Sequence, residues 1–569
     1  MKKLKKGLEK IREFFDEESR KIKKHDLIII IILVLIYSVI AFSNLGDNKA
    51  PQTFYHFANA GNEAGIELKE STDVSKIRIY SGLEVGNYTL FASNDGETYN
   101  EIGKIASDLS FSWKDSNINS KFKYLKIIAD DENSYLGEVA LYDKYGDKLY
   151  IKASYENSNA LTDETEVVPG LISYKNSMYF DEVYFARSAY EYIHDLPTNE
   201  WVHPPLGKLI QTLPILVFGM TPFAWRLMGT IAGILMIPVM YVFGKTIFKK
   251  RKYGLLAALL MMFDNFHFAQ TRIGTVDSYL VLFIMLAALF MYKYLIIDKD
   301  EKLKPKLKYL ALSGLFFGLS VCVKWTGLYL GLGLAICFFT KLIRDSIKDK
   351  KLTKDYIKII LWCLLFFVLI PVVIYIASYL LFPNVAPYGV NSINDIFNQI
   401  KYMFDYHANL QEGHDFSSNW YTWPLMYKPV WFNVNYYGSN LKSTIVAIGN
   451  PAVWWMGIPA LVYLLINLIK NRKKELLFIL TLILATWLPY LFIGRCMFMY
   501  HFFPTLSFIM LGVVGLIKWI SEKFKTNLVY IIYTLAVIFF FIYFFPIVSG
   551  KVVTKEFIDT LRWFNNWIF

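Results

Sequence analysis

Two adjacent carboxylates, Asp181 and Glu182, lie in a polar stretch between apolar segments, and their types and spacing suit group-transfer chemistry. One of them can act as a general base toward an acceptor hydroxyl, while the other orients a substrate or helps to hold a metal ion. Adjacent helical residues point about 100° apart, so we expect the two acids to have different roles. An acidic helix N-terminus that complements the helix dipole is the alternative interpretation.

Basic residues follow the acidic pair. Arg187 lies within two helical turns of it, and Lys208 comes just after His203-Pro204-Pro205. The two prolines fix a rigid entry and favour a helix start, which places Lys208 in a first turn beside N–H groups suited to an anion. Acids beside phosphate-binding cations predict transfer chemistry at a lipid phosphate. A lysine that snorkels at the membrane interface is the alternative for Lys208.

Further charges lie within or beside apolar segments, where a charge is costly unless it lines a cavity or pairs with another charge. These residues are Arg226, Asp264, Arg272, Asp277, Lys324 and Arg495, and His501 follows the last of them. A phosphate headgroup would suit two or three of these cations. Structural ion pairing, for example of Arg272 with Asp277 or Asp264, is the alternative.

The composition predicts a multi-pass membrane protein. The 569 residues are 55% hydrophobic, and several runs reach the ~20 apolar residues that span a bilayer. Basic cytoplasmic loops account for the net charge of +12 without nucleic-acid binding. The four cysteines lie in or beside apolar runs and show no CxxC spacing, so neither a disulfide framework nor a thiolate metal site is expected.

We expect about eleven spans, at 26–44, 223–246, 253–270, 275–297, 308–323, 325–343, 356–381, 453–470, 476–493, 500–519 and 527–548. Five basic connections between spans begin at residues 245, 296, 341, 470 and 522. The positive-inside rule places all five in the cytoplasm. That orientation requires the short run 207–220, interrupted by Pro214, to be a re-entrant or interfacial helix. The N-terminus is then cytoplasmic, whereas the C-terminus and the acidic pair face outside the plasma membrane. Nucleotide sugars are absent there, so a donor must arrive attached to a lipid.

The remaining segments complete the expected domain organisation. Residues 1–25 resemble a basic amphipathic helix on the inner leaflet, with a solvated tail as the alternative. Residues 46–175 alternate short apolar runs with turn residues, which predicts an extracytoplasmic β domain and a linker. The expected order then continues with a catalytic outer loop at 176–220, transmembrane helices at 221–381, an outer loop at 382–452, transmembrane helices at 453–549 and an outer tail at 550–569.

Two family resemblances add to this picture. The phrases YTLFASNDGETYNEIG, FKYLKIIAD and GEVALYDKYGDKL resemble discoidin-like jelly-roll domains, which implies a carbohydrate- or surface-binding module; a structural spacer is the alternative. A second set of phrases, between about 175 and 510, resembles bacterial members of the protein O-mannosyltransferase family, glycosyltransferase family 39 of the GT-C fold. These are YFDEVYFARSAYEYI, HPPLGKLI, AWRLMGTIAG, FDNFHFAQTRIGTVDSYLVLF, KWTGLY, HANLQEGHDFSSNWYTWPL, GNPAVWWMGIPAL and RCMFMYHFFPTLSF.

The second resemblance implies a function. Family members transfer a sugar, usually mannose, from polyprenyl phosphate to Ser/Thr hydroxyls of exported proteins. We therefore expect inverting transfer, with Asp181 or Glu182 acting on the acceptor hydroxyl. The expected contacts to substrate or phosphate are Arg187, Lys208, Arg226, Arg272, Arg495 and His501. The inserted β domain departs from the usual family core, so a cell-wall polymer or lipid acceptor is the alternative.

A metal ion is the one cofactor that the resemblance suggests. Related aminoarabinose transferases bind a metal near the site, which makes His203 and His414 candidate ligands of a divalent cation, Mg or Mn. No organic cofactor is expected, and the oligomeric state stays open. A transporter, or a surface adhesion protein that displays the β domain, is the alternative from a different class. A transporter would place functional charges at mid-membrane in repeated halves. This chain shows no internal repeat, and its charges gather toward one face, which disfavours that class.

Overall fold

The structure is a computed structural model that describes residues 13–349, 354–380 and 389–569. Residues 1–12 of the predicted N-terminal amphipathic helix lie outside these residues. Residues 13–16 are helical, but residues 17–23 are not, so the predicted helix does not continue to residue 25. The chain forms two compact units. The membrane unit comprises Met1–Ser43, Asp195–Ile210 and Met228–Phe569, and the β unit comprises Asn44–His194 and Gln211–Leu227.

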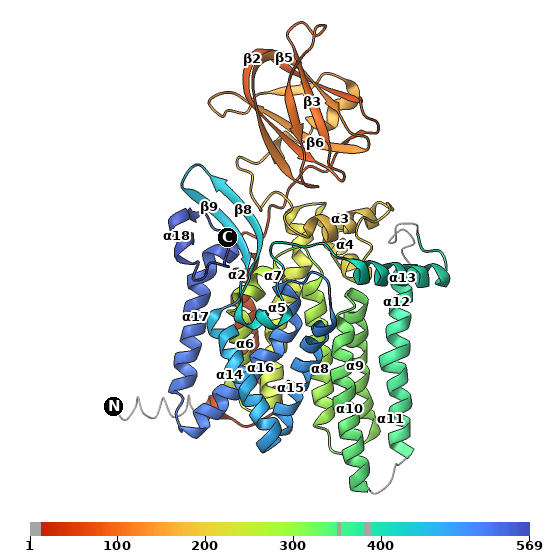
Figure 1. The fold of residues 1–569 in the computed structure, drawn as a ribbon, viewed down its shortest axis with the longest axis vertical. Coiled ribbons are helices and arrows are strands. Elements are labelled where there is room, and N and C mark those ends of the chain that lie inside the picture. Colours follow the sequence, from red (N-terminus) through yellow and green to blue (C-terminus); the bar gives the residue numbers. More distant parts are fainter. Residues whose placement is uncertain (1–12, 350–353, 381–388) are drawn as a thin grey trace. The chain divides into compact units, whose positions relative to one another are not determined.

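Ten helical segments in the described part of the chain are long and apolar enough to cross a membrane, which confirms the multi-pass prediction (Figure 1). The first five are α2 (Lys24–Phe42), α5 (Pro222–Phe248), α8 (Asp277–Leu295), α9 (Leu303–Val323) and α10 (Gly327–Asp349). The sixth runs from Lys354 to Leu380 through α11 (Lys354–Leu364), the π-helical η3 (Leu365–Leu369) and α12 (Ile370–Leu380). The others are α14 (Pro451–Ile466) with η6 (Asn467–Asn471), α15 (Lys474–Trp487) with η7 (Leu488–Phe492), η8 (Met499–Phe502) with α16 (Phe503–Lys523), and α17 (Leu528–Ser549).

The expected span 253–270 is not one continuous helix. It consists of α6 (Arg251–Met262) and α7 (Asn265–Thr271), separated at Asp264. The Asp264 carboxylate caps α7 by accepting the backbone N–H of His267 at 2.9 Å, and it also accepts the indole N–H of Trp454 at 3.0 Å. This cap stabilises the break, because it satisfies a backbone N–H that the start of a helix otherwise leaves open.

Helix α4 (Leu206–Phe218) is the short apolar helix expected around Pro214. Its 13 residues rise only about 20 Å, against the ~30 Å of a bilayer core. The length therefore agrees with a helix that does not cross the membrane. Lys208 lies in its first turn, as the two preceding prolines predict.

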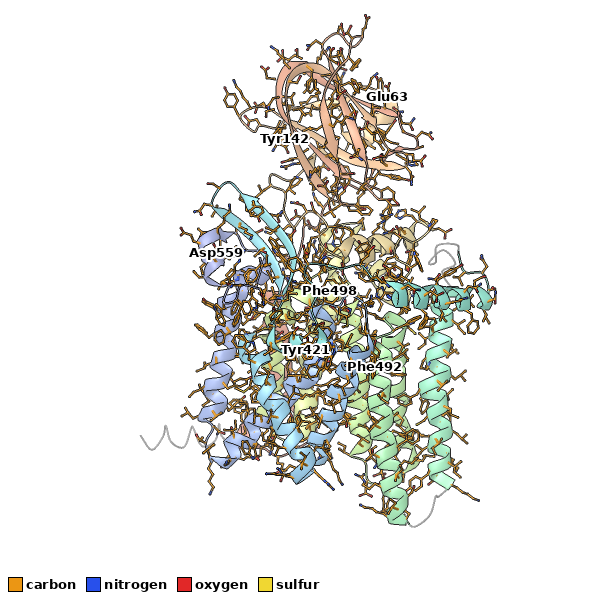
Figure 2. All side chains as sticks on the ribbon, viewed as in Figure 1. Glu63, Tyr142, Tyr421, Phe492, Phe498 and Asp559 are labelled. Carbon is orange, nitrogen blue, oxygen red and sulfur yellow. The ribbon has the colours of Figure 1, made fainter. Side chains whose placement is uncertain are left out.

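The segments between α12 and α14, together with the C-terminus, form small elements on the membrane unit. They are α13 (Ile393–Asn409), η5 (Trp420–Leu425), β8 (Val430–Tyr437), β9 (Leu441–Ala447), β10 (Val553–Thr554) and α18 (Lys555–Thr560). The strands form a sheet in the order β10-β9-β8, which the sequence patterns did not predict. Tyr421 and Phe492, labelled in Figure 2, expose 59% and 83% of their surface, as expected of aromatics at a membrane interface.

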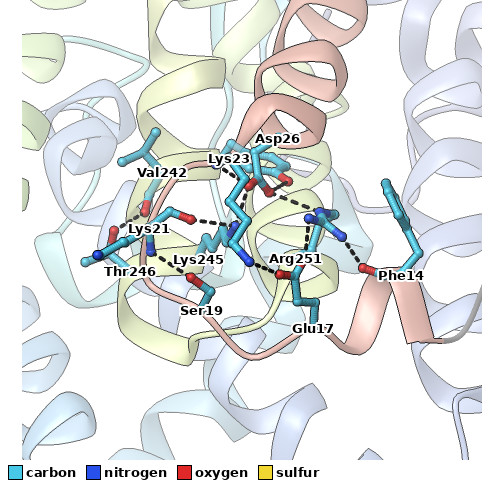
Figure 3. Close-up of polar contacts among 11 residues, drawn as sticks. Phe14, Glu17, Ser19, Lys21, Lys23, Asp26, Val242, Lys245, Thr246 and Arg251 are labelled. Carbon is cyan, nitrogen blue, oxygen red and sulfur yellow. Dashed lines mark hydrogen bonds and ion pairs between the residues drawn. The ribbon is translucent and has the colours of Figure 1, made fainter.

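A buried charge cluster holds the start of α2 against α5 and α6 (Figure 3). Asp26 is fully buried and accepts hydrogen bonds from the Tyr241 hydroxyl at 2.8 Å and the Arg251 Nε at 3.1 Å, and it pairs with Lys245. Arg251 also donates from Nη2 to Glu17 at 2.7 Å. The N-terminal segment is thus tied to two later helices by compensated charges, as burial of a carboxylate requires.

The β unit contains the predicted β domain. Its strands are β1 (Tyr55–Phe57), β2 (Glu63–Ser81), β3 (Asn87–Ser93), β4 (Asn100–Ala106), β5 (Trp113–Ala129), β6 (Ser134–Tyr142) and β7 (Ile151–Ala153). All pairs are antiparallel, in the order β1-β6-β2-β5-β3-β4, with β7 on β2. Register shifts after Glu67 and Val74 interrupt the β2·β5 ladder and let these long strands bend. The likeness to discoidin domains stays a prediction.

After β7, the chain continues with η1 (Glu156–Leu161), η2 (Thr165–Val167) and α3 (Glu182–Ile193). A second apolar core joins the β domain to α3: Tyr80 and Trp113 pack in one cluster with Ala186, Ala189 and Trp225. Burial of such aromatic surface contributes about 2–3 kcal/mol per side chain. The helix that begins at the acidic pair is therefore part of the same packed body as the β domain.

A buried carboxyl in the β domain gives a testable pH dependence. Glu138 is fully buried, and burial, with the nearby Asp163 and Glu164, raises its pKa to about 8. The pKa of this carboxyl is higher in the folded chain than its ordinary value of 4.5, so the folded state binds the proton more tightly than the unfolded state. The resulting stabilisation is fully present below pH 4.5 and is lost as the pH rises through 8. As the pH rises from 6 to 9, we expect the unfolding temperature of the wild type to fall relative to that of Glu138→Gln. The exposed control Glu101→Gln should show no such trend, and a pH-independent difference for Glu138→Gln would contradict the assignment.

Candidate functional site

The acidic pair lies at the start of α3 in the β unit. Phe180, just before it, has φ of 52°, which is a strained left-handed conformation for a residue other than glycine. Asp181 is the N-cap residue, but its side chain does not cap the helix, and it is half-buried. Such backbone strain typically occurs where a side chain is held in a fixed position for function.

Glu182 has a different environment from its neighbour. Its carboxylate is fully buried and receives two hydrogen bonds from Arg226, from Nε at 2.6 Å and from Nη2 at 2.7 Å. It also accepts the backbone N–H of Tyr179 at 3.2 Å. Because both oxygens are occupied by strong donors, Glu182 is poorly placed to take a proton from a substrate.

Arg226 is fully buried and uses all five of its N–H donors. Besides the two bonds to Glu182, Nη1 donates to Leu45 O at 3.0 Å and to Tyr174 O at 2.7 Å, while Nη2 donates to Ser177 O at 3.0 Å. This environment argues against the predicted phosphate contact, because a phosphate would have to displace buried partners. Instead, Arg226 fixes Glu182 and the three loops around α3.

Arg187 is also placed differently from its predicted role. It pairs with Glu191 on α3 at 2.8 Å and with Glu84 of the β domain. Its side chain is only 12% exposed. The two acids neutralise its charge, so Arg187 holds α3 to the β domain and offers little to an anionic substrate.

In the membrane unit, the HPPLGK stretch forms a buried triad with an acid that the sequence patterns did not single out. His203 Nδ1 lies 2.7 Å from Glu200 Oε1, and Lys208 donates to the other oxygen of Glu200. Burial raises the pKa of Glu200, but Lys208 and His203 outweigh that effect and hold it at about 2. Glu200 is therefore ionised throughout the physiological range and largely neutralises Lys208. Burial lowers the pKa of His203, so its ring is neutral near pH 7.

More polar residues gather around this triad. His407, on α13, lies 5.5 Å from His203 between ring centroids, and its Nε2 bonds to Val202 O at 2.8 Å. Burial, with the neighbouring His203, lowers the pKa of His407 to about 4. Lys324, between α9 and α10, interacts electrostatically with both histidines and pairs with Asp277 at 3.0 Å.

Arg495 is the cation of this group that best suits an anionic ligand. It is half-buried, and among the described residues it makes no ion pair with an acid. It lies within electrostatic range of His407, His501 and Tyr490. An arginine without a carboxylate partner in a cationic, aromatic setting is a suitable phosphate site.

His501 is buried in an aromatic stack beside Arg495. Its ring stacks on Tyr500 and Trp423, with centroids 4.8 and 6.1 Å away. The Tyr490 hydroxyl donates to His501 O at 3.2 Å, and His501 Nδ1 lies 3.0 Å from Phe498 O. Lys324, Arg495 and His203 lie within electrostatic range of His501, so the ring has a supporting position next to the cations.

Arg272 has different binding partners from the residues around His203 and Arg495. Its Nε and Nη2 donate to the carbonyls of Ala41 and Ser43 at 2.9 and 2.7 Å, and its guanidinium covers the ring of Phe268. A basic side chain on the last carbonyls of α2 satisfies groups that a helix end leaves open. This arrangement favours a structural role over the predicted phosphate contact.

The predicted metal ligands are His203 and His414. No group of three or more His, Cys, Asp or Glu side chains in the described part of the chain could hold a metal ion. His203 already bonds to Glu200, and the exposed His414 accepts the N–H of Phe416 at 3.1 Å and packs on Phe498. The residues present therefore do not fit the implied cation, and no step below uses one.

Sequence reasoning missed Glu200, Tyr490 and Trp423 as members of the site. Glu200 carried a usable signal, because it lies eight residues before Lys208 and three before His203. Tyr490 and Trp423 lie in aromatic-rich segments where composition does not distinguish a site residue from an interfacial anchor.

Comparisons with known proteins agree with this picture. The family model "Dolichyl-phosphate-mannose-protein mannosyltransferase" matches residues 210–382, and "C-terminal four TMM region of protein-O-mannosyltransferase" matches residues 392–567. A polyprenol-phosphate-mannose–protein mannosyltransferase of Mycobacterium tuberculosis is 22% identical over 460 residues, which cover 68% of this chain and 86% of the relative. The protein of the same name from Corynebacterium glutamicum is 24% identical over 428 residues, covering 64% and 81%.

The fold has a known counterpart among solved structures. The Saccharomyces cerevisiae protein O-mannosyltransferase Pmt1-Pmt2 complex, bound to its sugar donor, superposes with a TM-score of 0.61 at 15% identity over 69% of this chain and 89% of that chain. The two family models together match more than half of the chain, outside the β domain. This chain therefore belongs to the protein O-mannosyltransferase family, and it carries the family's GT-C membrane fold together with an inserted β domain.

Proposed function

We propose that this protein transfers mannose from a polyprenyl-phosphate donor to Ser/Thr hydroxyls of exported proteins, with inversion at the anomeric carbon. The observation that carries the proposal is that the two acids have different environments. Glu182 is bound to Arg226 by two hydrogen bonds, while Asp181 is half-buried at a strained turn. The names of the bacterial relatives supply the donor and the acceptor class.

Asp181 is the proposed general base. Its carboxylate accepts the proton of the acceptor hydroxyl as the hydroxyl oxygen forms a bond to the anomeric carbon. The bond from that carbon to the phosphate oxygen breaks, and its electron pair leaves with the polyprenyl phosphate. Glu182 and Arg226 position the turn that presents Asp181 and do not exchange protons with the substrate.

Arg495 is the proposed contact to the departing phosphate. A guanidinium offers paired N–H donors that match two phosphate oxygens, and Arg495 has no carboxylate partner in the described structure. Lys324 is paired with Asp277 at 3.0 Å, so Arg495 is the main cation available to the phosphate. Charge that develops on the leaving oxygen is stabilised by such fixed cations.

The outer face of the plasma membrane is the proposed location of transfer. If α6 and α7 together cross once and α4 does not cross, every basic connection, including those after α5, α8 and α16, falls on the same side as the N-terminus. The positive-inside rule makes that side cytoplasmic. The β domain, α13 and the C-terminus then face outside.

The test uses membranes that contain the full-length protein, polyprenyl-phosphate-[³H]mannose and a Ser/Thr-rich acceptor peptide. We expect labelled peptide from which base releases mannose by β-elimination, and a product anomer opposite to that of the donor. Label that enters only lipid or wall polymer would contradict a protein acceptor. Absence of transfer from the mannose donor, with transfer from another polyprenyl-phosphate sugar, would overturn the sugar assignment.

The role of Arg495 makes a separate prediction. Arg495→Ala should lower kcat/KM for the donor about 10- to 100-fold, because a charged hydrogen bond is worth about 1.5–3 kcal/mol. Arg495→Lys keeps the charge but not the paired donors, so its kcat/KM for the donor should lie between those of the wild type and Arg495→Ala. The exposed Lys401→Ala on α13 serves as the control and should be unchanged. Equal donor kinetics in Arg495→Ala and wild type would exclude this phosphate contact.

A further inference from the structure

A polar cavity lies within the membrane unit, among residues that the transfer chemistry does not use. It has a volume of about 480 Å³ and is lined by the last turns of α8 and α10, the first turns of α15, residues 295–300 and Arg20. These elements carry three of the basic connections, so the cavity opens at the membrane face that holds the N-terminal segment and the basic loops.

The charges of this cavity are predominantly positive. Six basic side chains line it against four acidic ones. Asp345 is already shared between Lys341 at 3.0 Å and Arg344 at 3.2 Å. Lys348 and Lys474 are exposed and, in the described part of the chain, make no ion pair. The cavity therefore presents cations in excess of its own acids.

The remaining lining is apolar. Ile336 and Cys337 on α10 and Leu477 and Phe478 on α15 lie one to three turns farther along their helices from the charged residues. Helices α10 and α15 are membrane-spanning, so the apolar lining lies toward the hydrocarbon and the cations lie toward water. A ligand that satisfies both parts needs an anionic headgroup and an attached hydrocarbon chain.

We propose that this cavity binds one anionic phospholipid of the inner leaflet, such as phosphatidylglycerol. The phosphate would contact Arg344, Lys348 and Lys474, and the start of an acyl chain would lie along Ile336 and Phe478. Basic pockets between transmembrane helices on the cytoplasmic side bind anionic headgroups in this way. A soluble phosphate compound would leave the apolar lining without a partner, which is why a lipid is the chosen occupant.

The test is native mass spectrometry of the delipidated full-length protein in detergent, titrated with phosphatidylglycerol or phosphatidylcholine. We expect one phosphatidylglycerol to bind at least tenfold more tightly than phosphatidylcholine. Arg344→Ala/Lys348→Ala should weaken phosphatidylglycerol binding about tenfold or more, because each basic residue adds substantial attraction to an anionic headgroup. Thr340→Trp, which fills the cavity without changing its charge, should also reduce binding.

The matched control is Lys304→Ala/Lys308→Ala, which removes two exposed charges on α9 outside the cavity. Its affinity for phosphatidylglycerol should stay within twofold of the wild type. Equal losses in the control and the cavity variants would show diffuse surface attraction and overturn the site. Competition by glycerophosphoglycerol, which lacks acyl chains, at the same concentration as the lipid would overturn the lipid assignment. The readout needs no sugar donor, so it is independent of the proposed transferase activity.

Discussion

Replacing Asp181 by Asn is expected to lower kcat for mannosyl transfer by about 10²- to 10⁴-fold, the range that a general base contributes. Asparagine keeps the size and hydrogen-bonding reach of the side chain but cannot accept the hydroxyl proton. Because Asp181 does not cap α3 and is half-buried, the unfolding temperature should stay close to that of the wild type. The KM for the donor should also change little, because the phosphate contacts involve other residues.

The measurement is initial-rate transfer by purified protein across a range of pH. The activity of the wild type should fall at low pH, because the general base becomes protonated there. The residual activity of Asp181→Asn should not show this fall. Asp73→Asn, the same change at an exposed site on β2, is the control and should retain full activity. Activity of Asp181→Asn within threefold of the wild type would remove this residue from the reaction.

Replacing Arg226 by Met is the second large effect, and it acts on stability. Glu182 would be left buried without its cation, which typically costs about 3–5 kcal/mol. The carbonyls of Leu45, Tyr174 and Ser177 would also lose their donor. We expect a lower unfolding temperature, faster proteolysis between α3 and the β domain, and transfer activity near background.

A double variant separates stability from catalysis. Glu182→Leu/Arg226→Met replaces the pair by apolar groups, so no charge is left buried, and much of the lost stability should return. Transfer should stay strongly reduced, because the turn that presents Asp181 has lost its fixed partner. If the double variant were as unstable as Arg226→Met alone, the Glu182 charge would not be the cause of the instability.

The sequence was sufficient to predict most elements of the fold, but not the sheet of β8, β9 and β10 or the break between α6 and α7. Apolar length and basic loops located the spans, and Pro214 marked the helix too short to cross. Alternation with turn residues located the strands of the β domain. The break at Asp264 was missed because a single carboxylate within an apolar run also occurs in continuous helices, and its partner Trp454 is 190 residues away.

The site was predicted in part. The sequence placed Asp181, Lys208, His203 and Arg495 among the functional candidates, but it could not distinguish a cation with a buried partner from one without. Glu182 and Arg226 are 44 residues apart, and Arg272 reaches carbonyls about 230 residues away. Such pairings depend on tertiary packing, which residue type and local spacing do not encode.

The charge cluster at Asp26 has a consequence for how the chain is made. Asp26 lies at the start of the first span, whereas its partner Arg251 is synthesised 225 residues later, after the whole β domain. At the usual 5–20 residues per second, the ribosome needs roughly 10–45 s to supply that partner. During this interval the carboxylate must stay hydrated at the membrane surface, and its position in the first turn of α2 permits this. The first span can thus settle at its final depth only when α5 and α6 arrive, so membrane assembly finishes after the whole β domain has been synthesised.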